Sequence, residues 1–226
     1  MSEFTNRVVL VTGAAGALGR AVVDHFARNG AIVAQLDIVG IDNNHYSAIC
    51  DLTNPESCTK AVTDIVESLS KIDVLANIAG GFTMGTPVHE TSDDTWDFML
   101  GLNARSVFNM ARAVVPFMLP RQTGKIINIG ARAGLRGAPN MAAYSASKSV
   151  VMRLTESLAD ELKEKGINVN AILPSIIDTE RNREDMPDAD FSRWVSPEAV
   201  AGVVAFLASP AADPIHGALV PVEGLS

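Results

Sequence analysis

Short runs of apolar residues alternate along this chain with longer segments in which apolar residues recur every three or four positions. A short apolar run that ends in glycine or a polar turn is typical of a buried parallel strand, and the longer pattern is typical of an amphipathic helix. We expect strands at residues 7–12, 31–36, 47–50, 72–76, 125–129, 167–173 and 218–222. This alternation favours an α/β fold.

Capping residues mark the ends of several expected helices. Asn54 followed by Pro55 is typical of a helix N-terminus, and Gly30 is typical of the position after a helix C-terminus. Residues 196–198 should open the final helix in the same way. Residues 180–192 are polar and irregular in pattern, so we expect a mobile lid there.

Two long helical patterns occupy the middle of the chain. The first spans residues 92–119, with a break expected near Gly101 and a kink at Pro116. The second spans residues 141–165 and ends at Gly166. Its apolar stripe consists of Val151, Leu154, Leu158 and Leu162.

A glycine-rich turn joins the first expected strand to the first expected helix. It consists of Gly13, Ala14, Ala15, Gly16, Ala17, Leu18 and Gly19. Glycines let the backbone approach a pyrophosphate, and the free N–H groups of a helix N-terminus attract its charge. Strand, glycine loop, helix and second strand together form the opening of a dinucleotide-binding unit. The alternative is a strand-to-helix turn that happens to be rich in glycine.

An acidic residue ends the second expected strand. Asp37 lies 18 residues after Gly19, and a carboxylate there can bind the ribose hydroxyls of an adenosine while repelling a 2′-phosphate. No Arg or Lys lies in the glycine loop before Arg20, and none adjoins Asp37. These features predict NAD as the cofactor in preference to NADP. The alternative is an aspartate that merely caps a turn.

Tyr144 and Lys148 stand four residues apart in the second long helical pattern, so they lie one turn apart on one face. A phenol has an ordinary pKa near ~10, and a neighbouring ammonium lowers it. Such a tyrosine can exchange a proton with a carbonyl or alcohol near neutral pH. The same pair also occurs as plain surface residues. Asn103, inside an apolar helix, either holds a water or braces the backbone.

Composition narrows the class of protein and its partners. The 226 residues suffice for one α/β core. The chain has 18 Lys and Arg against 26 Asp and Glu, a net charge of −8 that argues against nucleic acid or an anionic membrane as the main partner. We expect no signal peptide and no membrane span. Cys50 and Cys58 lack CxxC spacing, which indicates reduced thiols in a cytoplasmic protein, and no metal site is expected.

Together these residues resemble the short-chain dehydrogenase/reductase family over almost the whole chain. Residues 12–19 resemble its TGxxxGxG loop, with Ala17 at the usual middle glycine, and residues 77–80 resemble its NNAG motif, with Ala76 for the first asparagine. Residues 174–179 resemble its PGxVxT segment, with serine for the glycine. Beyond the glycine loop and Asp37, the resemblance implies cofactor-binding roles for Asp51, Leu52, Asn77, Ala79, Gly80, Tyr144, Lys148, Pro174, Ile177 and Thr179.

The resemblance also implies a fold, a reaction and an assembly. The fold is a Rossmann-type, doubly wound and mostly parallel sheet of seven strands in the order 3-2-1-4-5-6-7, as a single domain over residues 1–226. Hydride passes between nicotinamide and a carbonyl, alcohol or imine-like carbon of a small-molecule substrate. Tyr144 is the acid/base, Lys148 supports it and binds the nicotinamide ribose, and Asn103 holds a proton relay. Subunits pair through the two long helices as a homodimer or homotetramer.

One position departs from the family pattern. The catalytic serine of the family lies thirteen residues before the tyrosine, where this chain has Ala131. A methyl group cannot hydrogen-bond a substrate oxygen, although the similar dihydropteridine reductase branch lacks this serine and acts on an activated, quinonoid substrate. Two hypotheses therefore stand. Tyr144, Lys148 and Asn103 favour an oxidoreductase, and Ala131 favours a cofactor-binding protein without turnover, such as a sensor or assembly subunit.

Three further residues near these motifs have two interpretations each. Phe82 and Met84 follow residues 77–80, where they either line a substrate pocket or pack as ordinary loop residues. Arg132 either replaces the missing hydroxyl with a charge or points to solvent. The sequence identifies neither the substrate nor the direction of the reaction.

Overall fold

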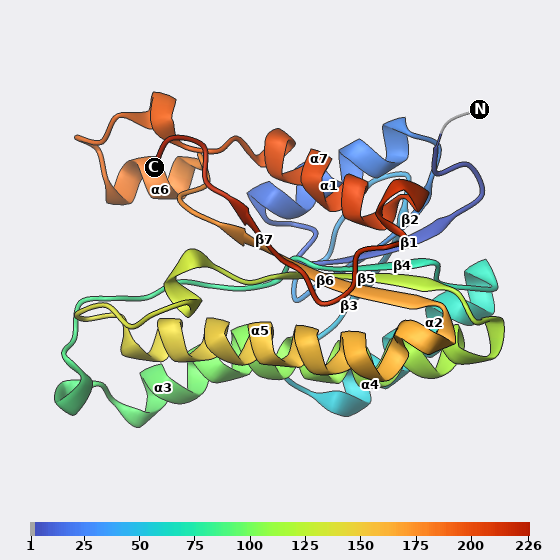
Figure 1. Ribbon diagram of the computed structural model, residues 1–226, viewed down its shortest axis with the longest axis horizontal. Coiled ribbons are helices and arrows are strands. Elements are labelled where there is room, and N and C mark those ends of the chain that lie inside the picture. Colours follow the sequence, from blue (N-terminus) through green and yellow to red (C-terminus); the bar gives the residue numbers. More distant parts are fainter. Residues whose placement is uncertain (1–2) are drawn as a thin grey trace.

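The computed structural model describes residues 3–226, whose seven strands form one sheet in the order β3-β2-β1-β4-β5-β6-β7 (Figure 1). Every pairing between neighbours is parallel. The strands are β1 (Val8–Thr12), β2 (Ile32–Asp37), β3 (Tyr46–Ile49), β4 (Val74–Asn77), β5 (Gly124–Ile129), β6 (Ile167–Pro174) and β7 (Leu219–Val222). The expected fold class and strand order are confirmed.

Helices cover both faces of the sheet. In Figure 1, α1, α6 and α7 lie on one side and α2, α3, α4 and α5 on the other. The α-helices are α1 (Ala17–Arg28), α2 (Pro55–Leu69), α3 (Asp93–Met99), α4 (Ser106–Met118), α5 (Ala142–Leu162), α6 (Glu180–Asp185) and α7 (Pro197–Ala208). Between these elements lie short 3-10 turns at Val88–Glu90, Leu119–Arg121, Arg132–Gly134, Lys163–Lys165, Phe191–Arg193 and Pro210–Ala212.

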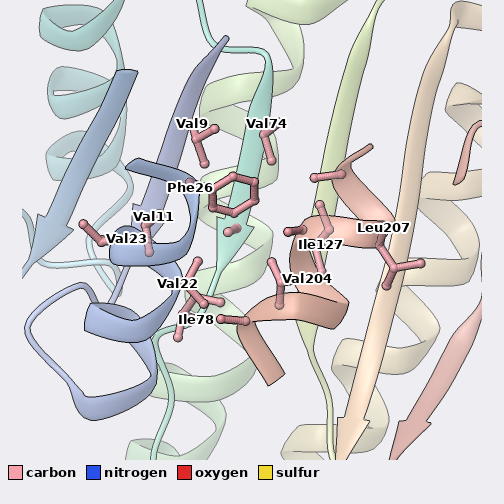
Figure 2. Packing of buried hydrophobic residues seen from close by; sticks show 14 of the residues in the cluster. Val9, Val11, Val22, Val23, Phe26, Val74, Ile78, Ile127, Val204 and Leu207 are labelled. Atoms are coloured by element: carbon pink, nitrogen blue, oxygen red, sulfur yellow. The ribbon is translucent and has the colours of Figure 1, made fainter. Parts of the chain in front are cut away.

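The central strands serve two hydrophobic cores at once. Val9 and Val11 of β1 belong to the core under α1 and α7, together with Phe26 and Val204 (Figure 2). Leu10, between them, belongs to the core on the opposite face, under α2 and α4. Successive side chains of a strand point to opposite faces, so a strand buried on both sides is mostly apolar along its length. This explains the continuous apolar runs in the sequence and fixes the carboxyl ends of the strands in one rigid edge.

The expected helix caps are present. The Asn54 side chain accepts a hydrogen bond from Ser57 N, and Pro55 is the first residue of α2. Gly30 follows α1 with a φ of +84°, in the left-handed region that favours glycine. Ser196 accepts a hydrogen bond from Ala199 N at the start of α7. These caps could be predicted from the sequence because each involves residues within one turn of the helix end.

The α-helical pattern of residues 92–119 is interrupted near Gly101, as expected, since α3 ends at Met99 and α4 begins at Ser106. A π-helical segment, Leu100–Arg105, joins α3 to α4. A π-turn inserts an extra residue into a helix and so changes the direction of the side chains, often beside functional sites. Asn103 lies within this segment and is buried. Pro116 lies inside α4, which ends two residues later at Met118.

The expectation of an irregular segment at residues 180–192 was wrong for its first part, which is α6. The Thr179 hydroxyl caps this helix by accepting a hydrogen bond from Asn182 N at 3.2 Å. Arg183 donates from Nε and Nη2 to the Asp178 carboxylate at 2.6 and 2.7 Å. A cap and an ion pair can hold a short polar helix that has little apolar surface to bury. Movement of this segment stays a prediction.

Candidate active site

The glycine loop is closely packed. Gly13 has a φ of +64°, and a Cβ on it would lie 2.7 Å from Ala79 Cα. A Cβ on Gly19 would lie 2.0 Å from Gly13 O, so neither position has room for a side chain. Gly16 precedes α1 without a side-chain cap, which leaves the first N–H groups of the helix for an anion. The residues between these glycines that are at least partly exposed are Ala15, Ala17 and Leu18.

Asp37 lies beside the glycine loop. Its Oδ2 accepts a hydrogen bond from Ala15 N at 2.9 Å, and its Oδ1 accepts one from Val39 N at 3.3 Å. The carboxylate therefore ties the end of β2 to the loop, as the turn-capping interpretation requires, and remains partly exposed. Arg20, exposed in the first turn of α1, donates from Nη1 to Ala15 O at 2.5 Å. The backbone N–H and C=O of Ala15 thus contact an anionic and a cationic side chain, respectively.

The turn after β3 lies next to Asp37. Cys50 N donates to Asp37 O at 2.8 Å, which brings the following Asp51 and Leu52 to the same edge of the sheet. Asp51 Oδ1 accepts hydrogen bonds from the backbone N–H and the hydroxyl of Thr53, at 2.9 and 2.7 Å. Leu52 is buried, with its carbonyl accepting from Asn109 Nδ2 at 2.9 Å. A fixed carboxylate and an apolar side chain here suit the adenosine end of a dinucleotide.

The residues after β4 are held by polar contacts beneath them. Asn77 Nδ2 donates to Asn128 Oδ1 at 2.9 Å, joining the ends of β4 and β5. Thr12 Oγ1 accepts from Ile78 N at 3.1 Å and from Ala79 N at 3.3 Å. These bonds fix the path of the chain from β4 across the end of β1, where the glycine loop begins.

Asn103 braces this loop from below. Its Oδ1 accepts from Gly81 N at 2.9 Å, and its Nδ2 donates to Gly81 O at 3.1 Å and to Ser147 Oγ at 3.0 Å. A Cβ on Gly80 would lie 2.8 Å from Asn103 Oδ1 and 3.3 Å from Lys148 Nζ. The structure thus brings Gly80, Asn103 and Lys148 together. It gives Asn103 the bracing role that the sequence left open, and a water relay stays a prediction.

Lys148 is buried in α5 and directed at the end of β5. Its Nζ donates to Ile129 O at 2.8 Å. Burial lowers the pKa of Lys148 to about 8, because the ammonium has lost most of its contact with water. Lys148 is therefore buried. The alternative that Tyr144 and Lys148 are both ordinary surface residues is wrong for Lys148.

Burial raises the pKa of Tyr144 to about 12, which is opposite to the direction expected from the sequence. Loss of contact with water disfavours the phenolate, and this desolvation is the cause of the raised pKa. The ring of Phe82 packs edge-on against the Tyr144 ring, with centroids 4.8 Å apart and planes at 87°. Spacing along a helix could not have revealed this contact.

Ala131 lies two residues after the end of β5 and is 5% exposed. It precedes the 3-10 turn Arg132–Gly134 in an extended conformation, with φ −164° and ψ 154°. The Arg132 guanidinium forms an ion pair with Glu223 Oε1 at 2.9 Å and donates to Ser226 O at 3.1 Å. Arg132 is therefore exposed to solvent, as one of the two alternatives expected, and it contacts the C-terminal segment there.

The segment after β6 has its own local partners. Pro174 ends β6, and the Ser175 hydroxyl donates to Glu223 O at 2.7 Å. Ile177 pairs with Val195 through an isolated parallel bridge. The Thr179 hydroxyl already caps α6. All of these residues leave the same sheet edge as the residues after β4 and β5, as the parallel topology requires.

Two polar residues of the site were missed by the sequence analysis. Ser147 Oγ donates to Tyr144 O at 2.7 Å and accepts from Asn103, linking α5 to the π-helical segment. Asn128 Nδ2 donates to Thr155 Oγ1 at 2.9 Å while its Oδ1 accepts from Asn77. A buried asparagine inside an apolar strand was a usable signal for the second. Nothing marked Ser147, because serine is common near helix starts.

Within residues 3–226, no helix is both long and apolar enough to cross a bilayer. The same residues contain no group of three or more His, Cys, Asp or Glu side chains arranged to hold a metal ion. Cys50 and Cys58 are both free and buried.

Comparison with known proteins agrees with this geometry. A family model described as short chain dehydrogenase matches residues 7–190. The chain is 31% identical over 238 residues to the 3-oxoacyl-(acyl-carrier-protein) reductase of Thermotoga maritima, with 96% of each protein covered. It is 34% identical over 240 residues to an NAD-dependent glycerol dehydrogenase of Listeria innocua, covering 98% of this chain and 94% of that protein.

Solved structures give the same result. The crystal structure of an NAD⁺-bound xylitol dehydrogenase superposes with a TM-score of 0.91 at 29% identity, covering 98% of this chain and 99% of that one. Nothing in these comparisons favours a binding protein without turnover over an enzyme. The fold, the glycine loop, the Tyr144–Lys148 pair and the family match lead to one conclusion: the chain belongs to the short-chain dehydrogenase family of nicotinamide-dependent oxidoreductases.

Proposed function

We propose that Tyr144 is the acid/base of a hydride transfer between nicotinamide and a small carbonyl or alcohol, with Lys148 and Asn103 in supporting roles. The observation that carries this proposal is the convergence of buried Lys148 and Asn103 beneath Gly80, where a Cβ would lie 3.3 and 2.8 Å from their polar atoms. Burial of a lysine costs free energy. A buried Lys148 one turn from Tyr144 therefore favours a chemical role for the pair.

The residues present fit a dinucleotide. Gly13 and Gly19 leave a cradle that a Cβ would fill, and α1 offers uncapped N–H groups to a pyrophosphate. The full proposed set is Gly13, Ala15, Gly16, Ala17, Leu18, Gly19, Asp37, Asp51, Leu52, Asn77, Ala79, Gly80, Tyr144, Lys148, Pro174, Ile177 and Thr179. When bound, the nicotinamide accepts or supplies the hydride.

The proton is handled by Tyr144 Oη. With a pKa of about 12, this phenol is protonated at neutral pH and ready to donate to a carbonyl oxygen as it is reduced. In the reverse direction it must accept a proton, and the Lys148 ammonium, with a pKa of about 8, is still mostly charged at neutral pH to stabilise the phenolate. Asn103 keeps the loop at Gly81 in place and, in the proposed relay, orients a water behind Lys148.

We propose NAD as the preferred cofactor. The Asp37 carboxylate lies within a hydrogen bond of the glycine loop, at 2.9 Å from Ala15 N, where it would accept from ribose hydroxyls and repel a 2′-phosphate. Arg20 is the competing feature, because its guanidinium reaches Ala15 O and could attract that phosphate. Two backbone N–H groups hold the Asp37 carboxylate in place, so we expect its negative charge to outweigh the positive charge of Arg20.

The chain is proposed to form one domain over residues 1–226 and to act in the cytoplasm on a small molecule, in a homodimer or homotetramer. The exposed side chains of Phe108 on α4 and Val150 on α5, at 42% and 39%, support pairing through these helices. Static light scattering at micromolar concentration should give two or four times the mass of 23.9 kDa. A monomer would contradict this assembly.

Tyr144→Phe tests the catalytic assignment. This variant keeps the ring against Phe82 but loses the exchangeable proton, so turnover should disappear while NAD affinity stays nearly unchanged. Lys148→Ala should lower both, since the ammonium is proposed to serve the phenol and the ribose. Turnover is followed by nicotinamide absorbance with a panel of carbonyls and alcohols, and affinity by calorimetry. Full activity in Tyr144→Phe would require a different acid/base.

A further inference from the structure

Two loops flank Tyr144 at the carboxyl edge of the sheet. One follows β4 and holds Phe82 to Val88, and the other lies between β5 and α5. Both leave the same end of the sheet, and Gly85 N donates to Asn140 O at 2.9 Å to join them (Figure 1). They therefore form one continuous wall beside the tyrosine, and not two independent loops.

This wall exposes large apolar side chains. Phe82 is 52% exposed and Met84 57% on the first loop, and Leu135 is 60% exposed on the second. Large apolar groups gathered beside polar catalytic residues are typical of a site that takes an apolar ligand. Residues 80–88 carry no charged side chain. On the second loop, Arg132 is paired with Glu223, which leaves exposed Arg136 as the remaining cation of residues 130–141.

Phe82 is held in a fixed position next to the reacting oxygen. Gly81 precedes Phe82, and the Asn103 side chain forms hydrogen bonds with both Gly81 N and Gly81 O, at 2.9 and 3.1 Å. The Phe82 ring then lies edge-on to Tyr144, 4.8 Å between centroids. A substrate oxygen must come within about 3 Å of the Tyr144 hydroxyl for proton transfer. A substrate bound at this hydroxyl would therefore lie close to the Phe82 ring, whose exposed part is open to one of its substituents.

We infer that Phe82 is a specificity-determining residue and that the site takes a ketone or secondary alcohol carrying a flat apolar group, such as an aryl or conjugated ring, beside the reacting carbon. This rests on the proposed function. The ring of the substrate packs on Phe82, and Met84 is a second exposed apolar side chain of the same loop. A carboxylate or phosphate at that position would meet a loop, residues 80–88, that carries no charged side chain to bind it.

The test compares three activated carbonyl compounds that differ in one group. They are 1-phenyl-1,2-propanedione, 2,3-butanedione and pyruvate, each assayed for kcat/KM with NADH in the original protein, Phe82→Ala and Phe82→Trp. Phe82→Ala should lower kcat/KM for the phenyl compound by about three- to tenfold, the range expected for one aromatic pair. Phe82→Trp should retain it, and butanedione should change little in either. Phe206→Ala, which removes a 47% exposed ring from α7 on the opposite face of the sheet, is the matched control.

Binding separates failure of this inference from failure of the proposed function. In the Tyr144→Phe background with NAD bound, calorimetry compares 1-phenylethanol with 2-butanol, and Phe82→Ala should remove the preference for the phenyl compound. Absence of turnover on every compound would contradict the catalytic proposal alone. The inference on Phe82 is overturned by equal binding of the two alcohols, by a Phe82→Ala effect shared by all compounds, or by a preference for pyruvate that Arg136→Ala abolishes.

Discussion

Ala131→Ser should turn this protein into a better enzyme for ordinary ketones. The family site uses two donors to the substrate oxygen, and here Tyr144 must act alone because Ala131 offers only a methyl group. Losing one preorganised donor typically costs ~2.7–4 kcal/mol, or roughly a hundred- to a thousandfold in rate. Restoring the hydroxyl should recover a gain of that order in kcat/KM for a simple ketone such as cyclohexanone.

The local geometry is compatible with a hydroxyl at this position. Ala131 is extended and stands directly before the 3-10 turn Arg132–Gly134, the position of an N-cap. A serine there can accept a hydrogen bond from an N–H of the turn, a contact usually worth about 1 kcal/mol. The hydroxyl proton is then free to donate to the substrate. The buried hydroxyl would have a partner in the free enzyme, so the substitution should not lower the free energy of unfolding appreciably.

The assay follows NADH absorbance with cyclohexanone in the original protein, Ala131→Ser and a control. Ala133→Ser is the matched control, because it adds the same hydroxyl two residues further along the same turn and should give no gain. Thermal unfolding of all three proteins checks that any change is not one of stability. The reasoning fails if the original protein already reduces the ketone efficiently and Ala131→Ser changes nothing, because another group must then bind the oxygen.

Two further predictions concern the cofactor and pH. NAD(H) should bind more tightly than NADP(H), and Asp37→Ala should narrow the difference; calorimetry with both cofactors measures this, and equal affinities in the original protein would rule it out. The pKa of Lys148 rises from about 8 in the folded protein to ~10.4 in an unfolded chain. The unfolded state therefore binds more protons between these values, and stability should increase as pH rises from about 8 toward about 10. Above that range Tyr144, with its pKa raised to about 12, acts in the opposite sense. Urea unfolding at about pH 7.5 and about pH 9.5 should show the increase in the original protein and not in Lys148→Met; an equal increase in both would assign it to other groups.

Much of the fold was predictable because it depends on local signals. The apolar run of β1 is continuous since both faces of this strand are buried, and helix caps such as Asn54 act within one turn. The segment at residues 180–192 was mispredicted because α6 is held by Thr179 and by the Asp178–Arg183 pair, not by an apolar face. Pattern analysis measures apolar periodicity and is blind to such polar support.

In the candidate site, too, local features could be predicted from the sequence and long-range contacts could not. The glycine loop and the Tyr144–Lys148 spacing are sequential features, and their residue types carry their chemistry. The partners of Asn103 lie 22 and 44 residues away at Gly81 and Ser147, so no local pattern could name them.

The sequence by itself determined the strand and helix order and the family, and it indicated the residues that we propose to bind a dinucleotide, because these features depend on neighbours along the chain. The tertiary structure alone decided which way the pKa of Tyr144 moves, since desolvation depends on how deeply the phenol is buried. It also decided that Arg132 pairs with Glu223, 91 residues later. Burial and long-range pairing are sums over atoms that the chain brings together only when it folds.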